Sequence, residues 1–229
     1  MISKDNLSFL SALSAHNNRN WFQENREQYE LALKNTTDFA DAVLTLLQQH
    51  DHIENESGKK SLMRIYRDVR FSKDKSPYKT NWAVFFKRAT KELRGGYYVH
   101  IKPGECFVGG GFWNPESADL KLIRDAIVSE EQELRAIIEA DSFVKVYGKN
   151  ALHGDSLKNV PRGYDKDSTA GDLLRLKQFL IRKDFTDQEA QSPDFPKKVD
   201  EAFRALRPFF DFMSYHLTHD GNGEPLYKD

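Results

Sequence analysis

The chain concentrates positive charge in one short stretch. Eight Lys and Arg side chains fall between Lys59 and Lys79, against two acids, Asp68 and Asp74, so this stretch carries +6 in a chain whose formal net charge is −1. A positive cluster that a rigid element holds in a fixed pattern attracts anions. Arginine suits bidentate contacts with phosphate or carboxylate, and lysine adds less directional charge. The chemistry that these residues predict is anion binding.

Alternation of apolar and polar residues over 63–71 predicts that a strand positions much of this charge. Arg64, Tyr66, Asp68 and Arg70 would share one strand face, and Arg67 would fall on the opposite, apolar face. A buried arginine needs a partner carboxylate, so we expect Arg67 to serve the architecture. The residues predicted to bind the anion are Arg64, Arg70, Lys73, Lys75, Lys79 and, from a later loop, Arg162.

Two other side chains are candidates for proton transfer. His100 alternates with apolar neighbours in 97–102, so it would share a strand face with Tyr98 and Lys102. Imidazole titrates near neutral pH and can act as a general acid or base. The competing interpretation is a histidine that only makes a hydrogen bond across a sheet. Tyr78, in the basic stretch, is the second catalytic candidate, and whether the protein is an enzyme stays open.

The remaining histidines give little support for a metal site. His50 and His52 are set too close for one regular helix face, whereas His216 and His219 have the i, i+3 spacing that can chelate a metal. The sequence fixes no third ligand near either pair. We therefore expect no metal and no cofactor.

The surrounding pattern predicts one α+β domain over residues 1–229. Helices are expected in three regions, with Ser3 as the N-cap of the first helix and a break between two helices at Asn35-Thr36-Thr37. Short connections between the strands favour an antiparallel sheet, covered by N-terminal, middle and C-terminal helices. The expected strands lie near 62–71, 81–87, 96–102, 105–112 and 178–185. Within them, Gly109-Gly110-Gly111 is typical of close approach by another backbone or by a ring such as that of Trp113.

Composition excludes several classes of protein. No apolar run approaches the roughly 20 residues that cross a bilayer, so no membrane association is expected. The single cysteine, Cys106, excludes an internal disulfide and fits a reducing compartment. We expect a cytoplasmic protein.

Four blocks of sequence together carry a family resemblance. They are NNRNWFQENREQYE at 17–30, RIYRDVRFSKDKSPYKTN at 64–81, GYYVHIKPGECFVGGGFW at 96–113 and LKNVPRGYDKD at 157–167. They resemble a widespread bacterial and fungal family of about this length, catalogued as a conserved domain of unknown function. The resemblance spans nearly the whole chain and implies a single-domain α+β protein. It supplies no substrate, cofactor or catalytic residue.

These observations lead to three hypotheses. The first is that the basic block binds an anionic, phosphate-bearing small molecule, either with or without acting on it. The second is nucleic-acid binding by the same basic and aromatic surface, which the balanced net charge makes the weaker of the two. The third is a protein-interaction module in which the arginines form a salt-bridge network with the chain's own acids. The sequence leaves the oligomeric state open.

Overall fold

The structure is a computed structural model that describes residues 1–226. Within these residues it is an α+β fold with an antiparallel sheet of four strands in the order β1-β2-β3-β4. The strands are β1 (Trp82–Lys87), β2 (Gly96–Ile101), β3 (Cys106–Phe112) and β4 (Phe179–Phe185). The α+β class and the four strands predicted near 81–87, 96–102, 105–112 and 178–185 are confirmed. None of the helices in the described part of the chain is long and apolar enough to span a membrane.

The chain forms two compact units. Unit 1 comprises Met1–Lys87, Tyr98–Val108 and Asp184–Glu201, and unit 2 comprises Arg88–Tyr97, Gly109–Lys183 and the residues from Ala202 onward. The expectation of a single domain over 1–229 stays a prediction.

The helices of unit 1 are mostly N-terminal. They are α1 (Lys4–Ala15), α2 (Arg19–Glu24), α3 (Arg26–Leu47), α4 (Gly58–Ser61), α9 (Asp187–Ala190) and the start of α10 (Phe195–Thr218). Ser3 caps α1 as predicted, because its hydroxyl accepts a hydrogen bond from the Asn6 backbone N–H at 3.2 Å. The break expected at Asn35-Thr36-Thr37 is wrong, since α3 continues through it. The Thr36 and Thr37 hydroxyls donate to carbonyls one turn back, at 2.9 Å each, and so are satisfied within the helix.

A buried polar side chain joins α1, α3 and β1 in the core of unit 1. The Asn6 amide donates to the Thr36 hydroxyl at 2.8 Å and to the Ala32 carbonyl at 3.0 Å, and its oxygen accepts the Trp82 indole N–H at 2.7 Å. Buried polar groups that are fully hydrogen-bonded specify one arrangement of their neighbours. Asn6 therefore fixes Trp82, the first residue of β1, against the N-terminal helices.

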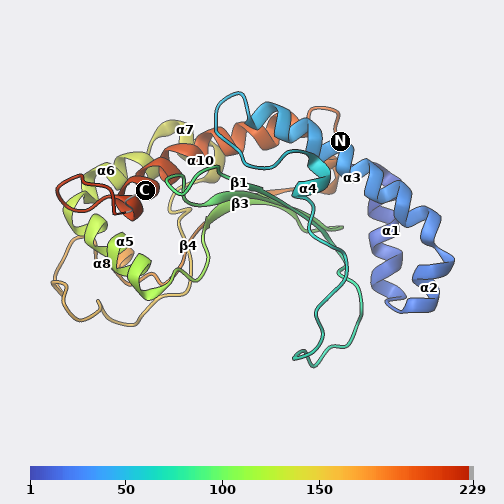
Figure 1. Cartoon of the computed structure of the whole chain (residues 1–229), viewed down its shortest axis with the longest axis horizontal. Helices are drawn as coiled ribbons and strands as arrows, with labels where there is room; N and C mark the ends of the chain where they lie inside the picture. Colours follow the sequence, from blue (N-terminus) through green and yellow to red (C-terminus); the bar gives the residue numbers. More distant parts are fainter. Residues whose placement is uncertain (227–229) are drawn as a thin grey trace. The chain divides into compact units, whose positions relative to one another are not determined.

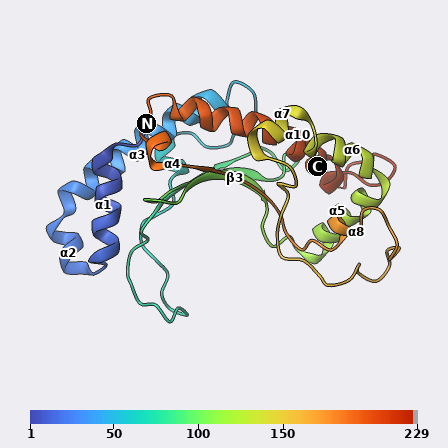
Figure 2. The ribbon, with the colours of Figure 1, turned by 180° about the vertical axis from the view of Figure 1, so that it is seen from behind.

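Residues 62–81 form an arm that leads into β1. Figures 1 and 2 show it as a long teal loop extending away from α4 and β1. The strand predicted near 62–71 is therefore wrong: the arm's two sides meet only at separate points, such as the bridge of Tyr66 to Tyr78 and the 2.7 Å hydrogen bond from Lys79 N–H to the Ile65 carbonyl. The apolar residues of the expected inner face include Phe71, which is 96% exposed. Ile65 of that face is buried, but Met63 and Phe71 are exposed, so no layer covers the whole face and the alternating sequence gains little from forming a regular strand.

Unit 2 contains α5 (Ser117–Ser129), α6 (Glu131–Ile138), α7 (Asp141–Tyr147), α8 (Gly171–Leu174) and most of α10. Two glycines of β3 let β4 lie close. A Cβ at Gly109 would fall 2.1 Å from the Ile181 carbonyl oxygen, and one at Gly111 would fall 2.0 Å from that of Phe179. The predicted close approach of another backbone is confirmed, and the Trp113 ring is instead largely exposed.

Candidate functional site

A shallow hollow lies where the base of the arm meets the sheet in unit 1. We call it the arm-base hollow; its volume is about 390 Å³. Its lining residues are Met63, Arg67, Asp68, Lys79, Asn81, Ala83, Tyr98 and His100. The hollow thus combines members of the basic block with the histidine and a tyrosine of β2.

Strand β2 positions the imidazole of His100. Tyr97, Val99 and Ile101 are buried on one face, while Tyr98 and His100 are partly exposed on the other, as the alternation predicts. The His100 ring stacks on Phe107 with centroids 4.7 Å apart. It is therefore held in one orientation from the side of the sheet.

Two groups of the hollow approach Nδ1 of His100. The Tyr98 hydroxyl lies 3.1 Å from this atom, and the Asn81 amide nitrogen lies 3.4 Å from it. Burial raises the pKa of Tyr98, so its hydroxyl keeps its proton at neutral pH. These contacts direct Nδ1 toward the protein and orient the ring within the hollow.

Lys79 brings a positive charge to which no carboxylate of the described chain is bound. The backbone bond to Ile65 holds the residue at the base of the arm, and its side chain is half-buried. Within residues 1–226, the Lys79 ammonium makes no ion pair and no hydrogen bond to a carboxylate. Burial, and then the nearby charge of Arg64, lower the pKa of Lys79. An anion bound in the hollow would favour the charged form of Lys79 and so oppose both effects.

Arg67 lies beside Lys79 in the hollow but is already paired. Its guanidinium binds the Asp74 carboxylate and donates to the Ser76 carbonyl at 3.2 Å. The carboxylate partner predicted for Arg67 is thus found, although the side chain is 26% exposed and not fully buried. Arg67 braces the turn of the arm and adds charge at the edge of the hollow.

Asp68 is the carboxylate that lines the hollow, and Arg70 holds it. The Arg70 guanidinium donates to both Asp68 oxygens, at 3.0 Å and 2.7 Å. This contact keeps the pKa of Asp68 below its usual value. The negative charge of Asp68 is therefore offset by an adjacent guanidinium.

The other residues predicted to bind an anion lie outside the arm-base hollow. Arg64, Arg70 and Lys73 lie exposed on the arm outside the hollow, and Lys75 there donates to the Val69 carbonyl at 2.9 Å. Arg162 belongs to unit 2, where it is exposed. Of the predicted set, only Lys79 lines the arm-base hollow.

Tyr78 lies in the core of unit 1 and does not line the hollow. Its ring stacks on Phe22 at a centroid distance of 4.0 Å, and only 6% of the residue is exposed. Its backbone N–H and carbonyl both bond to the Asn17 side chain, at 3.1 Å and 2.9 Å. This arrangement anchors the arm to α2 and gives the Tyr78 hydroxyl no place beside Lys79.

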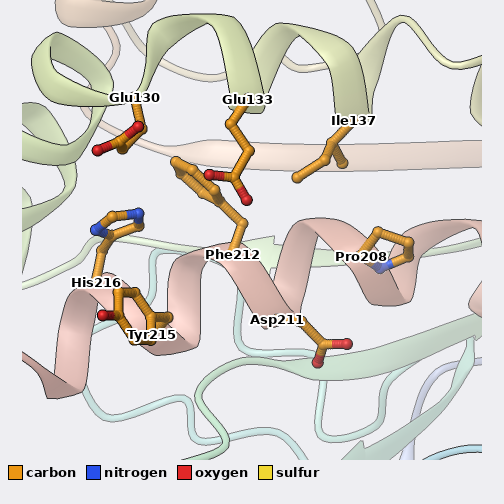
Figure 3. A pocket seen from close by; sticks show the side chains of 8 residues that line it. All are labelled: Glu130, Glu133, Ile137, Pro208, Asp211, Phe212, Tyr215 and His216. Atoms are coloured by element: carbon orange, nitrogen blue, oxygen red, sulfur yellow. The ribbon is translucent and has the colours of Figure 1, made fainter. Parts of the chain in front are cut away.

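A second hollow, of about 670 Å³, lies between α6 and α10 in unit 2 (Figure 3). Its lining residues are Glu130, Glu133, Ile137, Pro208, Asp211, Phe212, Tyr215 and His216. In Figure 3, Glu130 and Glu133 face the α10 side chains from above. Burial, the largest influence, lowers the pKa of His216, while the two glutamates oppose that shift. With its carboxylates, this hollow does not suit an anion.

The two histidine pairs considered as metal ligands make other contacts. His50 bonds through Nε2 to Asp200 at 2.8 Å, and His219 stacks on Tyr215. Over residues 1–226, no group of three or more His, Cys, Asp or Glu side chains is placed to hold a metal ion.

Sequence reasoning missed the contribution of Asn81 and Tyr98 to one hollow with Lys79. The alternation in 97–102 places Tyr98 and His100 on one face, but only the fold shows that the base of the arm covers that face. The signal that could have pointed to it is the position of Lys79 and Asn81, immediately before the strand that pairs with β2.

Comparison with known proteins gave one match. A family model described as a conserved hypothetical protein, DUF2461, matches residues 5–212. Searches of the curated proteins and of the solved structures found no match.

Proposed function

The chain belongs to the conserved hypothetical protein family DUF2461, and we propose from the geometry of the arm-base hollow that it binds an anionic, phosphate-bearing small molecule there. The observation that carries this proposal is Lys79, whose ammonium faces a hollow without a carboxylate partner in the described chain. The ammonium of an exposed lysine is hydrated by water and needs no partner. Lys79 is half-buried, so a bound anion would replace water that the fold has removed.

The neighbours of Lys79 suit a phosphate group. Arg67 adds a second positive charge, the Asn81 amide can donate a hydrogen bond, and His100 is held in a fixed orientation. Charge-assisted hydrogen bonds from such donors to phosphate oxygens are stronger than those between neutral groups. A hollow of about 390 Å³ takes a small molecule and not a folded partner.

The hollow also holds groups that can move a proton. His100 lies in it with its Nδ1 directed toward Tyr98 and Asn81, and a neutral imidazole could accept or donate a proton beside the bound phosphate. We assign no reaction to it. We also propose a cytoplasmic location, which the single buried cysteine, Cys106, supports.

Thermal unfolding with inorganic phosphate, pyrophosphate, a sugar phosphate and a nucleoside diphosphate tests the proposal. A ligand that binds only the folded state stabilises it by about 2.7 kcal/mol at a hundred times its Kd. We expect at least one of these compounds to raise Tm in a dose-dependent way. Calorimetric titration of that compound then gives the affinity.

The matched pair of variants is Lys79→Met and Lys59→Met. Lys59 is an exposed lysine of α4 outside the hollow, so the same substitution there controls for the loss of one charge. We expect Lys79→Met to weaken binding about tenfold or more and Lys59→Met to leave it unchanged. No stabilisation by any of the four compounds, or equal binding by both variants, would overturn the proposal.

A further inference from the structure

The tip of the arm exposes an aromatic ring completely. Phe71 is 96% exposed, the highest value among the large apolar residues of the described chain that stand out from the core. Phenylalanine is among the residues most often buried, and single exposed apolar residues usually retain some cover from their neighbours. Phe71 has almost none.

One guanidinium lies near this ring, and further cations follow along the arm. The Arg70 guanidinium lies 5.8 Å from the centre of the Phe71 ring. Arg64, Lys73 and Lys75 are exposed along the same arm. The two acids of the arm, Asp68 and Asp74, are each bound by an arginine.

The ion pair of Arg70 with Asp68 is open to exchange. Both side chains are well exposed, at 76% and 45%, and exposed ion pairs contribute little to stability. Arg70 can therefore turn to a phosphate at small cost. Lys73 has no ion pair to break within residues 1–226.

A bare ring among cations matches the chemistry of a nucleic-acid strand. Unpaired bases offer flat apolar faces on which an aromatic side chain stacks, and the backbone offers a phosphate at each step. An anionic membrane is a poorer fit, because stable attachment to lipid requires several adjacent apolar groups, and Phe71 is five or more positions from the arm's other large exposed apolar residues, Met63 and Tyr66. The extended arm carries its cations from Arg64 to Lys75, so they can follow a chain of phosphates.

We propose that the tip of the arm binds single-stranded nucleic acid, with a base stacked on Phe71 and phosphates contacted by Arg64, Arg70, Lys73 and Lys75. This inference does not rest on the arm-base hollow, because none of these five side chains lines it. Either site can fail without the other.

Fluorescence anisotropy with a labelled 20-nucleotide oligothymidine, titrated at several NaCl concentrations, tests the proposal. Each neutralised phosphate of a single strand contributes about −0.7 to the slope of log K against log salt, so four contacts predict a slope of about −2.8. We expect Lys73→Met to make this slope shallower by about 0.7. We expect a duplex of the same length to bind more weakly than the single strand.

The decisive variant is Phe71→Ala, with Leu31→Ala as its control. Leu31 is an exposed apolar residue of α3, 65% exposed, so its truncation removes a similar surface group away from the arm. Because stacking of one base contributes binding free energy, we expect Phe71→Ala to weaken binding about tenfold. We expect Leu31→Ala to have no effect and Phe71→Trp to retain the affinity of the parent chain. Both truncations are at the surface, so unchanged thermal midpoints will show that the fold is intact.

Three results would overturn the proposal. One is no binding of the oligothymidine at low salt; another is equal binding by Phe71→Ala and the parent chain. The third is tighter binding to phosphatidylserine vesicles than to the oligonucleotide, with loss of the vesicle binding in Phe71→Ala, which would assign the tip to a membrane surface.

Discussion

A buried arginine of unit 2 and the exposed cations of the arm in unit 1 use positive charge in opposite ways. In unit 2, Arg88 is 0% exposed and binds the Asp211 carboxylate, the Ser214 hydroxyl and the Arg94 carbonyl. In unit 1, the arm exposes most of its cations to solvent. The ion pairs that they form are exposed too, such as that of Arg70 with Asp68. The donors of the buried Arg88 are directed at fixed acceptors of the fold. The exposed cations of the arm keep donors that can bind a ligand.

The comparison shows why local charge density alone does not identify a ligand site. Arg88 follows directly after β1 in a stretch of mixed charge and would draw no attention from sequence, yet the fold encloses it completely. The arm has far more charge, yet few of its cations support the fold. What separates structure from ligand binding is whether a partly buried cation has fixed acceptors in the fold. Arg124 donates to the Leu174 and Leu176 carbonyls, whereas Lys79 binds no carboxylate within residues 1–226.

The largest effect is expected from Arg88→Met, which should destabilise the protein by about 3 kcal/mol. Loss of one partner from a buried pair leaves the others unsatisfied, and the value falls at the low end of the usual range because Asp211 is 46% exposed and also lies 3.3 Å from Arg207. Urea denaturation measures the change.

The matched substitution on the arm is Arg70→Met. It should leave the midpoint of urea denaturation almost unchanged, because the ion pair that it removes is exposed and screened by solvent. Similar losses of stability for Arg88→Met and Arg70→Met would remove the distinction between the buried arginine and the cations of the arm.

Lys79→Met should leave stability unchanged within about 0.5 kcal/mol, or raise it slightly. The substitution removes a half-buried ammonium whose charge the fold does not compensate, and methionine fills a similar volume. The midpoint of urea denaturation without any anion checks this. A loss of stability of about 2 kcal/mol or more would mean that Lys79 stabilises the fold and does not serve ligand binding.

The smallest effect concerns Asp74, whose pKa should lie at about 2. Hydrogen bonds from Ser76, and then the Arg67 guanidinium, favour the ionised form. Because this folded value is below the ordinary 3.8, the contribution to stability is present above pH 3.8 and is lost as pH falls through about 2. Carbon-13 NMR of the Asp74 carboxyl measures the pKa, and an ordinary value would show that the turn of the arm is not formed in solution.

Sequence predicted the sheet strands well because their signals are local. Alternation in 97–102 was enough to place Tyr98 and His100 together, and the glycines of β3 correctly indicated close backbone contact. The same alternation over 63–71 failed, since an alternating pattern becomes a regular strand only when another layer covers its apolar face. Phe71, left in solvent, shows that no such layer is provided at the arm's tip.

The candidate site was predictable only in its parts. Lys79 and His100 were both named from their residue types, but the sequence treats them as two separate features 21 positions apart. Their common hollow depends on the arm returning to the sheet at Lys79 and Asn81, and that return is fixed by tertiary contacts such as those of Tyr78 with Phe22 and Asn17. Local periodicity contains no information about contacts between such distant segments.

The pKa of the Lys79 ammonium, measured with and without pyrophosphate, tests the central claim most directly. Carbon-13 NMR of protein labelled at lysine Cε, with Lys79→Arg to assign the signal, gives both values. We predict a pKa below the ordinary 10.5 in the free protein and a rise when pyrophosphate binds, so that affinity falls as pH increases through the pKa of Lys79. A Lys79 pKa that pyrophosphate at saturating concentration leaves unchanged would contradict an anion site in the arm-base hollow.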